Sequence, residues 1–211
     1  MKFIRGFGLL FSLFAAVAMC GCSEAGDSRS AMEKIQDQLT QMQSYKCTAD
    51  VTRISNKGEN TFSTVQYYNS TGEYRMEITA PESAAGNYTV YDGKKVYQYN
   101  SKLNSNMAVE VDENQAPNEL FLGQFVKNYM QSEGVAVETA KMDEGRCTVL
   151  EAVIPGNYKY TSTEKLWVDN ETLKPVQFII YDIEGKERYI VTYNEFEYNV
   201  EFEDGTFKVP Q

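Results

Sequence analysis

The 211-residue sequence contains no histidine. Without an imidazole the chain cannot build a Ser–His or Cys–His nucleophile pair, and it lacks the commonest metal-binding side chain. It also has no glycine-rich phosphate loop, no CxxC pair and no HExxH motif, which are signatures of nucleotide, dithiol and zinc-protease chemistry. We therefore predict a protein that is not an enzyme, with no catalytic residues, no metal site and no cofactor.

Basic residues are also scarce, since 20 Lys and Arg stand against 30 Asp and Glu, for a formal net charge of −10. Such an acidic surface argues against binding nucleic acid and against adsorption to anionic lipid head groups. Simple solubility explains the acidity better than a basic partner would. No nucleic-acid partner is predicted.

Long hydrophobic runs are limited to one, Phe7 to Met19, which is too short to span a bilayer as a stable helix. The bases Lys2 and Arg5 precede it, as in a secretory signal peptide. Gly21 directly before Cys22 resembles the lipobox of bacterial lipoproteins, although a cysteine at the position before Gly21 departs from the usual Ala or Ser. We expect export, with Cys22 lipidated and anchoring the chain to the outer face of the cytoplasmic membrane. Ordinary secretion with cleavage nearby is the alternative.

This interpretation divides the chain into a signal peptide (1–21), a lipidated tether (22–30) and one domain (31–211). Loss of the signal peptide leaves 190 residues with a net charge of −12, because the removed segment carries two bases and no acids. That length is enough for a single domain with a full core. No internal linker interrupts it.

Two cysteines remain besides the anchor, Cys47 and Cys147, both in strand-like segments. In an exported protein an even pair suggests a disulfide. Three alternatives stay open: a disulfide within the chain, a disulfide between two chains of a homodimer, and two buried thiols.

Two segments have helical periodicity. The first, 31–43, follows a Ser30…Glu33 capping box and carries apolar residues at helical spacing. The second, 119–131, pairs Phe121 with Phe125, and Phe125 with Tyr129, at i,i+4. The second helix is predicted either to cap the core or to form a movable lid over a cavity.

The rest of the chain alternates with a period of two and is divided by short turns, so it predicts an antiparallel meander. Its most informative part is 163–199, three strands joined by two tight turns. The middle strand, Pro175–Tyr181, is apolar on both faces and should be covered on both sides. Further short strands are predicted at 158–161 and 200–203.

The predicted fold class is α+β: a strongly curved antiparallel sheet, an open and incomplete barrel of about ten or eleven strands, with helices covering its concave side. Acidic clusters near 182–187 and 201–204 fall at turns or edges, where solvated carboxylates are expected rather than catalytic ones. The residues predicted to line a cavity or lid are Phe121, Phe125, Tyr129, Trp167, Phe178, Ile180, Tyr189 and Val191.

Several short motifs resemble the LolA/LolB lipoprotein-carrier superfamily. They are Tyr74–Ile78 followed by Pro81, Tyr91-Asp92-Gly93-Lys94, Leu166-Trp167-Val168-Asp169 followed by Pro175, and Phe207-x-Val209-Pro210. The resemblance implies an incomplete barrel with a helical lid over an apolar cavity. Among members with a lipobox, the chain is most similar to the GerS group of clostridial germination lipoproteins. For that group the resemblance implies a non-enzymatic partner that activates a cortex-modifying N-acetylmuramoyl-alanine amidase.

Two hypotheses follow. In the first, the protein is a membrane-anchored binding module that regulates a cell-wall amidase in sporulation or germination. In the second, it carries or senses acyl chains in an apolar cavity of the half-barrel.

Overall fold

The computed structural model describes residues 29–112, 116, 118–132, 137–142 and 145–209. The predicted signal peptide, Cys22 and most of the tether lie outside the described residues. The two helices are α1 (Ala31–Thr40) and α2 (Leu122–Gln131). The strands are β1 (Ser44–Ser55), β2 (Gly58–Asn69), β3 (Tyr74–Ala80), β4 (Tyr88–Tyr91), β5 (Lys95–Asn100), β6 (Ser105–Glu110), β7 (Val137–Met142), β8 (Gly145–Val153), β9 (Thr163–Asp169), β10 (Pro175–Tyr181) and β11 (Glu187–Tyr198).

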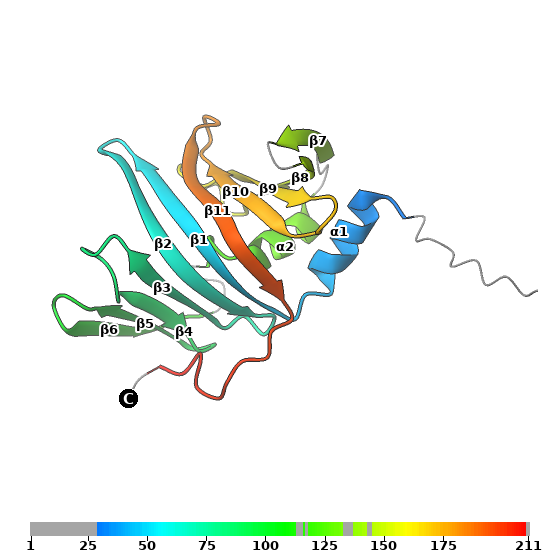
Figure 1. Cartoon of the computed structure of the whole chain (residues 1–211). Helices are drawn as coiled ribbons and strands as arrows, with labels where there is room; N and C mark the ends of the chain where they lie inside the picture. Colours follow the sequence, from blue (N-terminus) through cyan, green and yellow to red (C-terminus); the bar gives the residue numbers. More distant parts are fainter. Residues whose placement is uncertain (1–28, 113–115, 117, 133–136, 143–144, 210–211) are drawn as a thin grey trace, which may run out of the picture.

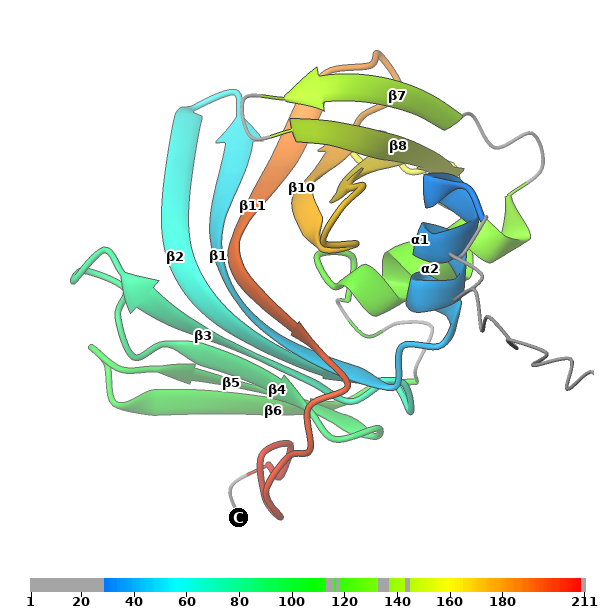
Figure 2. The same ribbon diagram turned by 45° about the vertical axis from the view of Figure 1, so that its right-hand side comes forward.

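The strands form one 11-stranded sheet in the order β6-β5-β4-β3-β2-β1-β11-β10-β9-β8-β7. Every neighbouring pair is antiparallel, and all neighbours are consecutive in the chain except β1 and β11. Figures 1 and 2 show that β7 to β11 curve around α1 and α2, whereas β3 to β6 extend away as a second wing. The predicted open, curved antiparallel sheet with helices on its concave side is confirmed.

Helix α1 begins at the predicted capping box. The Ser30 hydroxyl accepts a hydrogen bond from the Glu33 amide at 3.2 Å, and the Ser30 amide donates to the Glu33 carboxylate at 2.7 Å. Two backbone N–H groups of the first turn are thereby satisfied. The helix ends at Thr40, earlier than predicted, and Met42 is buried in the connection to β1 instead.

Alternation along the strands determines which side chains face inward. On β1, Tyr45, Cys47, Ala49 and Val51 are all buried in the core, as the period of two predicted. The doubly apolar strand β10 has a bulge between Pro175 and Gln177.

After this bulge, Phe178 and Ile180 point into the core and Ile179 lies on the convex face. Ile179 is 5% exposed and stands between Lys165 and Ile190 of the adjacent strands. Long neighbouring side chains, and not a second layer of described structure, cover that face.

Some predicted elements are wrong. Residues 158–161 form no strand, because Gly156 (φ 110°) and Asn157 (φ 52°) turn the chain out of the sheet after β8. Residues 200–203 form none either, because Asn199 (φ 56°) ends β11 in the same way. The edge strand β7 was not predicted, since its small residues Thr139 and Ala140 give a weak apolar pattern.

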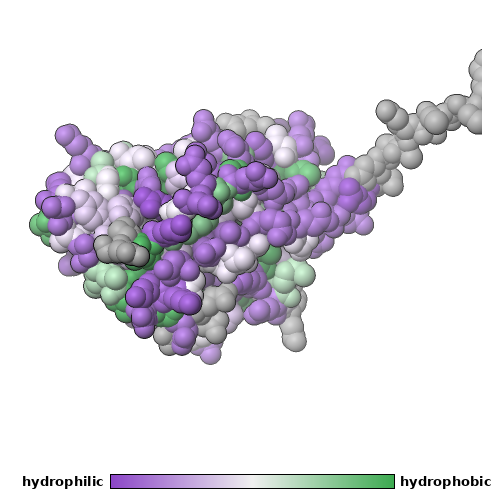
Figure 3. Space-filling view, turned by 90° about the horizontal axis from the view of Figure 1, so that it is seen from below, coloured by the Kyte–Doolittle hydropathy of each residue, from purple (hydrophilic) through white to green (hydrophobic). Residues whose placement is uncertain are grey.

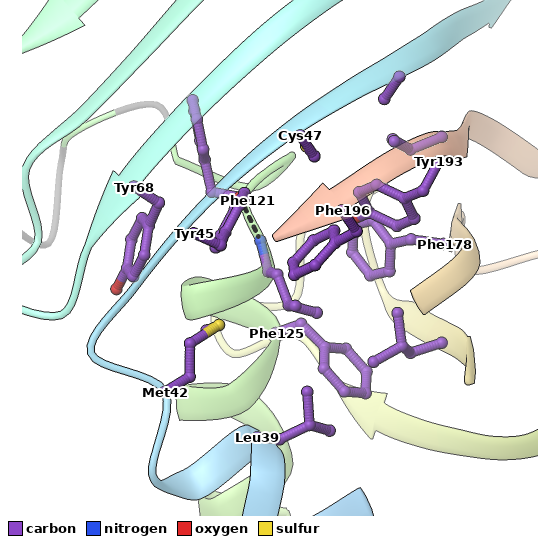
Figure 4. Packing of buried hydrophobic residues seen from close by; sticks show 14 of the residues in the cluster. Leu39, Met42, Tyr45, Cys47, Tyr68, Phe121, Phe125, Phe178, Tyr193 and Phe196 are labelled. Atoms are coloured by element: carbon purple, nitrogen blue, oxygen red, sulfur yellow. Dashed lines mark hydrogen bonds between the residues drawn. The ribbon is translucent and has the colours of Figure 1, made fainter. Parts of the chain in front are cut away.

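The core fills the space between the two helices and the curved half of the sheet (Figure 4). It combines Ile35 and Leu39 of α1 with Phe125 of α2 and the inward side chains of the strands. Helix α2 approaches β2 very closely at Gly123, where an added Cβ would lie 1.9 Å from Cζ of Tyr68. A glycine is therefore required for this packing.

Candidate functional site

Helix α2 fills the curved half of the sheet and does not stand over an empty cavity. Phe125 is 0% exposed; its ring meets Phe178 edge to face at 5.7 Å and stacks on Tyr129 at 5.8 Å. Tyr129 accepts a hydrogen bond from Nε2 of Gln36 at 2.8 Å, which links α2 to α1. The two helices thus act together as an internal plug.

The first turn of α2 lacks a side-chain cap, because Phe121 occupies the N-cap position. The Leu122 amide instead donates to the hydroxyl of Tyr45 at 3.1 Å, an interaction inside the core (Figure 4). Phe121 packs against Tyr74 with ring centroids 4.4 Å apart. The helix start is therefore fixed by β1 and β3. The predicted start at Glu119 is wrong, because Glu119 and Leu120 form a turn before the helix.

A largely apolar groove of ≈ 360 Å³ remains open where β1 to β5 face the segment before α2. Tyr74 lies at this groove, and its hydroxyl and Nε2 of Gln66 are buried without a hydrogen-bond partner among the described residues. Burial, and then the carboxylate of Glu119, raise the pKa of the Tyr74 hydroxyl. The other apolar side chains around the groove are Val51, Phe62, Met76, Ile78, Leu120 and Tyr189, and its polar ones are Arg53, Thr64, Thr89, Gln98 and Glu119.

A second cavity of ≈ 600 Å³ lies beside α2, on the other side of the segment that leads into the helix; we call it the polar cavity for the amides and carboxylates in its mixed lining. A chain of side-chain amides runs along it: Asn118 Nδ2 donates to Gln124 Oε1 at 3.0 Å, and Gln124 Nε2 to Asn128 Oδ1 at 2.9 Å. Asn128 Nδ2 then donates to Glu164 Oε1 at 2.8 Å. The chain ends on a carboxyl group that is 1% exposed.

Glu164 lies on β9 between Ala152 of β8 and Ile180 of β10, so its strand neighbours offer it no charge. Burial raises the pKa of Glu164 to about 7, although the hydrogen bond from Asn128 acts in the opposite direction. Lys127 and Glu119 also line the cavity. Sequence reasoning missed this site. The sequence pattern that could have revealed it is the alternation along β9, which places Glu164 in phase with the inward residues Leu166 and Val168.

The acidic turn after β10 has a structural role. The Asp182 carboxylate accepts hydrogen bonds from the Glu184 amide at 2.8 Å, the Lys186 amide at 2.9 Å and Nε of Arg188 at 2.8 Å. Burial raises the pKa of Asp182, but these donors outweigh it and the pKa is lowered. With these three hydrogen bonds, the Asp182 carboxylate stabilises the turn between β10 and β11.

Comparison with known proteins assigns the chain to a family. The model of YdcC-like sporulation proteins matches residues 3–207. The chain belongs to this YdcC-like family. No curated protein matches its sequence.

Several solved structures also resemble the chain. A chain from the structure of the CwlD amidase of Clostridioides difficile in complex with the GerS lipoprotein is 31% identical, with a TM-score of 0.50, covering 80% of this chain and 94% of that one. An uncharacterized conserved protein of Thermus thermophilus is 18% identical, with a TM-score of 0.55, covering 86% and 96%. The LolA superfamily protein NE2245 of Nitrosomonas europaea is 13% identical, with a TM-score of 0.45, covering 85% and 96%. The predicted LolA-like fold near the GerS group is confirmed.

The predicted lining residues of this YdcC-like protein divide into three groups. Tyr189 lies at the open groove, and Phe121 is shared between groove and core. Trp167 lies on the convex face, because Leu166 and Val168 on either side of it point inward, so its assignment to a cavity is wrong. The others are core residues: Phe125, Tyr129, Phe178, Ile180 and Val191.

Both cysteines are buried, each 2% exposed, and they are not bonded to each other. Cys47 points into the core opposite Phe196 of β11, whereas Cys147 lies out of phase with the inward residue Leu150 and faces the convex side. Three strands separate β1 from β8, at a spacing of about 4.8 Å each, and bridged Cα atoms must lie within about 7 Å. The alternative of a disulfide within the chain is therefore contradicted.

Among the described residues, no group of three or more His, Cys, Asp and Glu is arranged to hold a metal ion. In the same part of the chain, no helix is long and apolar enough to cross a membrane.

Proposed function

We propose that this YdcC-like protein is a non-enzymatic binding module that regulates a cell-wall hydrolase during sporulation or germination. The observation that carries the proposal is the 31% identity to a chain of the complex between the CwlD amidase and the GerS lipoprotein. The family description as a sporulation protein agrees with it. The partner is expected to be an N-acetylmuramoyl-alanine amidase.

The internal packing supports a binding role over a carrier role. Helices α1 and α2 occupy the curved half of the sheet with the protein's own side chains. The remaining apolar groove, ≈ 360 Å³, lies near the lower end of the roughly 300–1,000 Å³ range of small-molecule sites. A surface acting on another protein requires no larger cavity.

Affinity capture tests the partner. Full-length protein purified from sporulating cells of its source should enrich a wall amidase, identified by mass spectrometry, relative to an unrelated lipoprotein carrying the same tag. Adding the protein to that purified amidase should raise its activity on cortex. Absence of any wall hydrolase from the captured fraction would overturn the proposal.

The second candidate, a carrier or sensor of acyl chains, is favoured by one observation: the apolar groove with the unpartnered Tyr74 hydroxyl at its side. Native mass spectrometry of the captured protein distinguishes the two candidates. A carrier would show an added mass that dissociates as a fatty acid or phospholipid. The regulatory module should be empty, and its mass also reports whether it is a homodimer.

Membrane attachment through Cys22 is part of the proposal. Replacing Cys22 by alanine removes the thiol that would be acylated, and a net charge of −10 disfavours adsorption of the protein to anionic lipid. The variant should move from the membrane to the supernatant in cell fractionation, while a Cys47→Ala control stays in the membrane. A Cys22→Ala variant that remains membrane-bound would show that another anchor exists.

A further inference from the structure

The polar cavity beside α2 has the composition of a ligand site. Its floor carries a chain of hydrogen-bonded side chains from Asn118 through Gln124 and Asn128 to Glu164. Every amide in this chain donates toward the carboxyl end. Each side-chain NH₂ group has a second N–H, and each oxygen a second lone pair, to offer to a ligand.

Glu164 gives the cavity a deep acceptor. It is 1% exposed, yet it lines the cavity, so a ligand would meet it only after the amides. Burying a second full charge against it would carry a large desolvation cost, whereas a neutral hydroxyl or amide N–H can donate to it at little cost. The site therefore favours an uncharged ligand with several hydrogen-bonding groups.

An aromatic side chain lies at the cavity wall. Tyr158 is 62% exposed, and its position depends on Gly156, where an added Cβ would lie 2.5 Å from Cε2 of the ring. An exposed ring next to a polar cavity can cover the apolar face of a ligand whose edges are polar.

Charge narrows the ligand class further. The protein has a formal net charge of −10, and the cavity's one lysine, Lys127, is accompanied by Glu119 and Glu164. An anionic ligand would meet unfavourable electrostatics on approach. Figure 3 shows one face of the molecule, on which hydrophilic side chains predominate around smaller apolar patches.

We propose that this cavity binds an N-acetylated amino sugar of the cell-wall glycan. The hydroxyl and acetamido groups match the amide chain and Glu164, and the sugar ring has an apolar face for Tyr158. The assignment of the sugar to the cell wall rests on the proposed function. The existence of the polar site does not depend on it. The protein would then hold a hydrolase beside the polymer on which the hydrolase acts.

Side-chain amide signals in ¹⁵N–¹H NMR spectra of the full-length protein provide the test, without any partner enzyme. Titration with chitotetraose, the β-1,4-linked tetramer of N-acetylglucosamine, should shift the NH₂ signals of Asn118, Gln124 and Asn128 saturably. Cellotetraose has the same linkage but no acetamido group and should bind at least about tenfold more weakly. Absence of shifts at millimolar chitotetraose, or equal affinity for both sugars, would overturn the proposal.

A pair of variants localises the binding. Gln124→Ala removes the middle of the amide chain but places a strong helix former in α2, so folding should be preserved. Its affinity for chitotetraose should fall about tenfold. Gln36→Ala, an amide of α1 that bonds Tyr129 away from the cavity, should bind normally. Unchanged affinity in Gln124→Ala would place the sugar elsewhere and refute the site, while amidase capture would still test the proposed function independently.

Discussion

Replacing Phe125 by alanine should lower the free energy of unfolding by about 3–5 kcal/mol, the range for truncating buried aromatic side chains. Phe125 is 0% exposed and lies between Phe178 and Tyr129, so its removal leaves a cavity where α2 meets the sheet. Urea denaturation followed by circular dichroism measures the change.

Met130→Ala is the matched control on the same helix. Met130 is 63% exposed, so its truncation should change the free energy of unfolding by no more than about 0.5 kcal/mol. Equal effects of the two substitutions would show that α2 does not fill the half-barrel. A lid over an empty cavity would give that result, because neither side chain would then be tightly packed.

Replacing Glu164 by glutamine should change how stability depends on pH. The pKa of Glu164 is about 7 in the folded protein against 4.5 ordinarily, so between these values the folded state binds the proton more tightly than the unfolded state does. The neutral carboxyl therefore makes its full contribution to the free energy of unfolding below about pH 4.5, and this contribution is lost as the pH rises through 7. The loss amounts to about 3 kcal/mol.

Glutamine cannot ionise, and its oxygen can still accept the bond from Asn128. The variant should therefore be more stable than the wild type at pH 8, by up to about 3 kcal/mol, and nearly equal to it at pH 4. Urea titrations at both pH values measure this difference in stability. Glu195→Gln, a substitution of an exposed residue, is the control. If the difference between Glu164→Gln and wild type were the same at both pH values, Glu164 would not be the buried titrating group.

Local patterns predicted much of the fold because turn chemistry and alternation act over short distances. Both ends of β10, Pro175 and Tyr181, agree with the structure. Local patterns could not reveal that β1 pairs with β11. The paired residues Tyr45 and Tyr198 are separated by most of the sequence. Local patterns also could not show the backbone turns at Asn157 and Asn199, where asparagine adopts positive φ.

The site was less predictable than the fold. The aromatic spacing of Phe121, Phe125 and Tyr129 identified the right helix, but only packing decides whether a helix covers a cavity or fills it. Trp167 was placed in the cavity, whereas its phase relative to Leu166 puts it on the convex face. Glu164 could have been found from the sequence, because this acid alternates in phase with buried residues. A search for apolar residues alone does not detect it.

The pairing of the first strand with the last also affects how the protein can be made. A ribosome releases β1 long before β11, so β1 has only β2 beside it until synthesis is almost finished. During that interval one edge of β1 offers unpaired backbone groups to any neighbouring chain. Joining strands so distant in sequence is also slow, because the intervening chain must first be brought together. Pairing of β1 with β11 should therefore be a late step in folding.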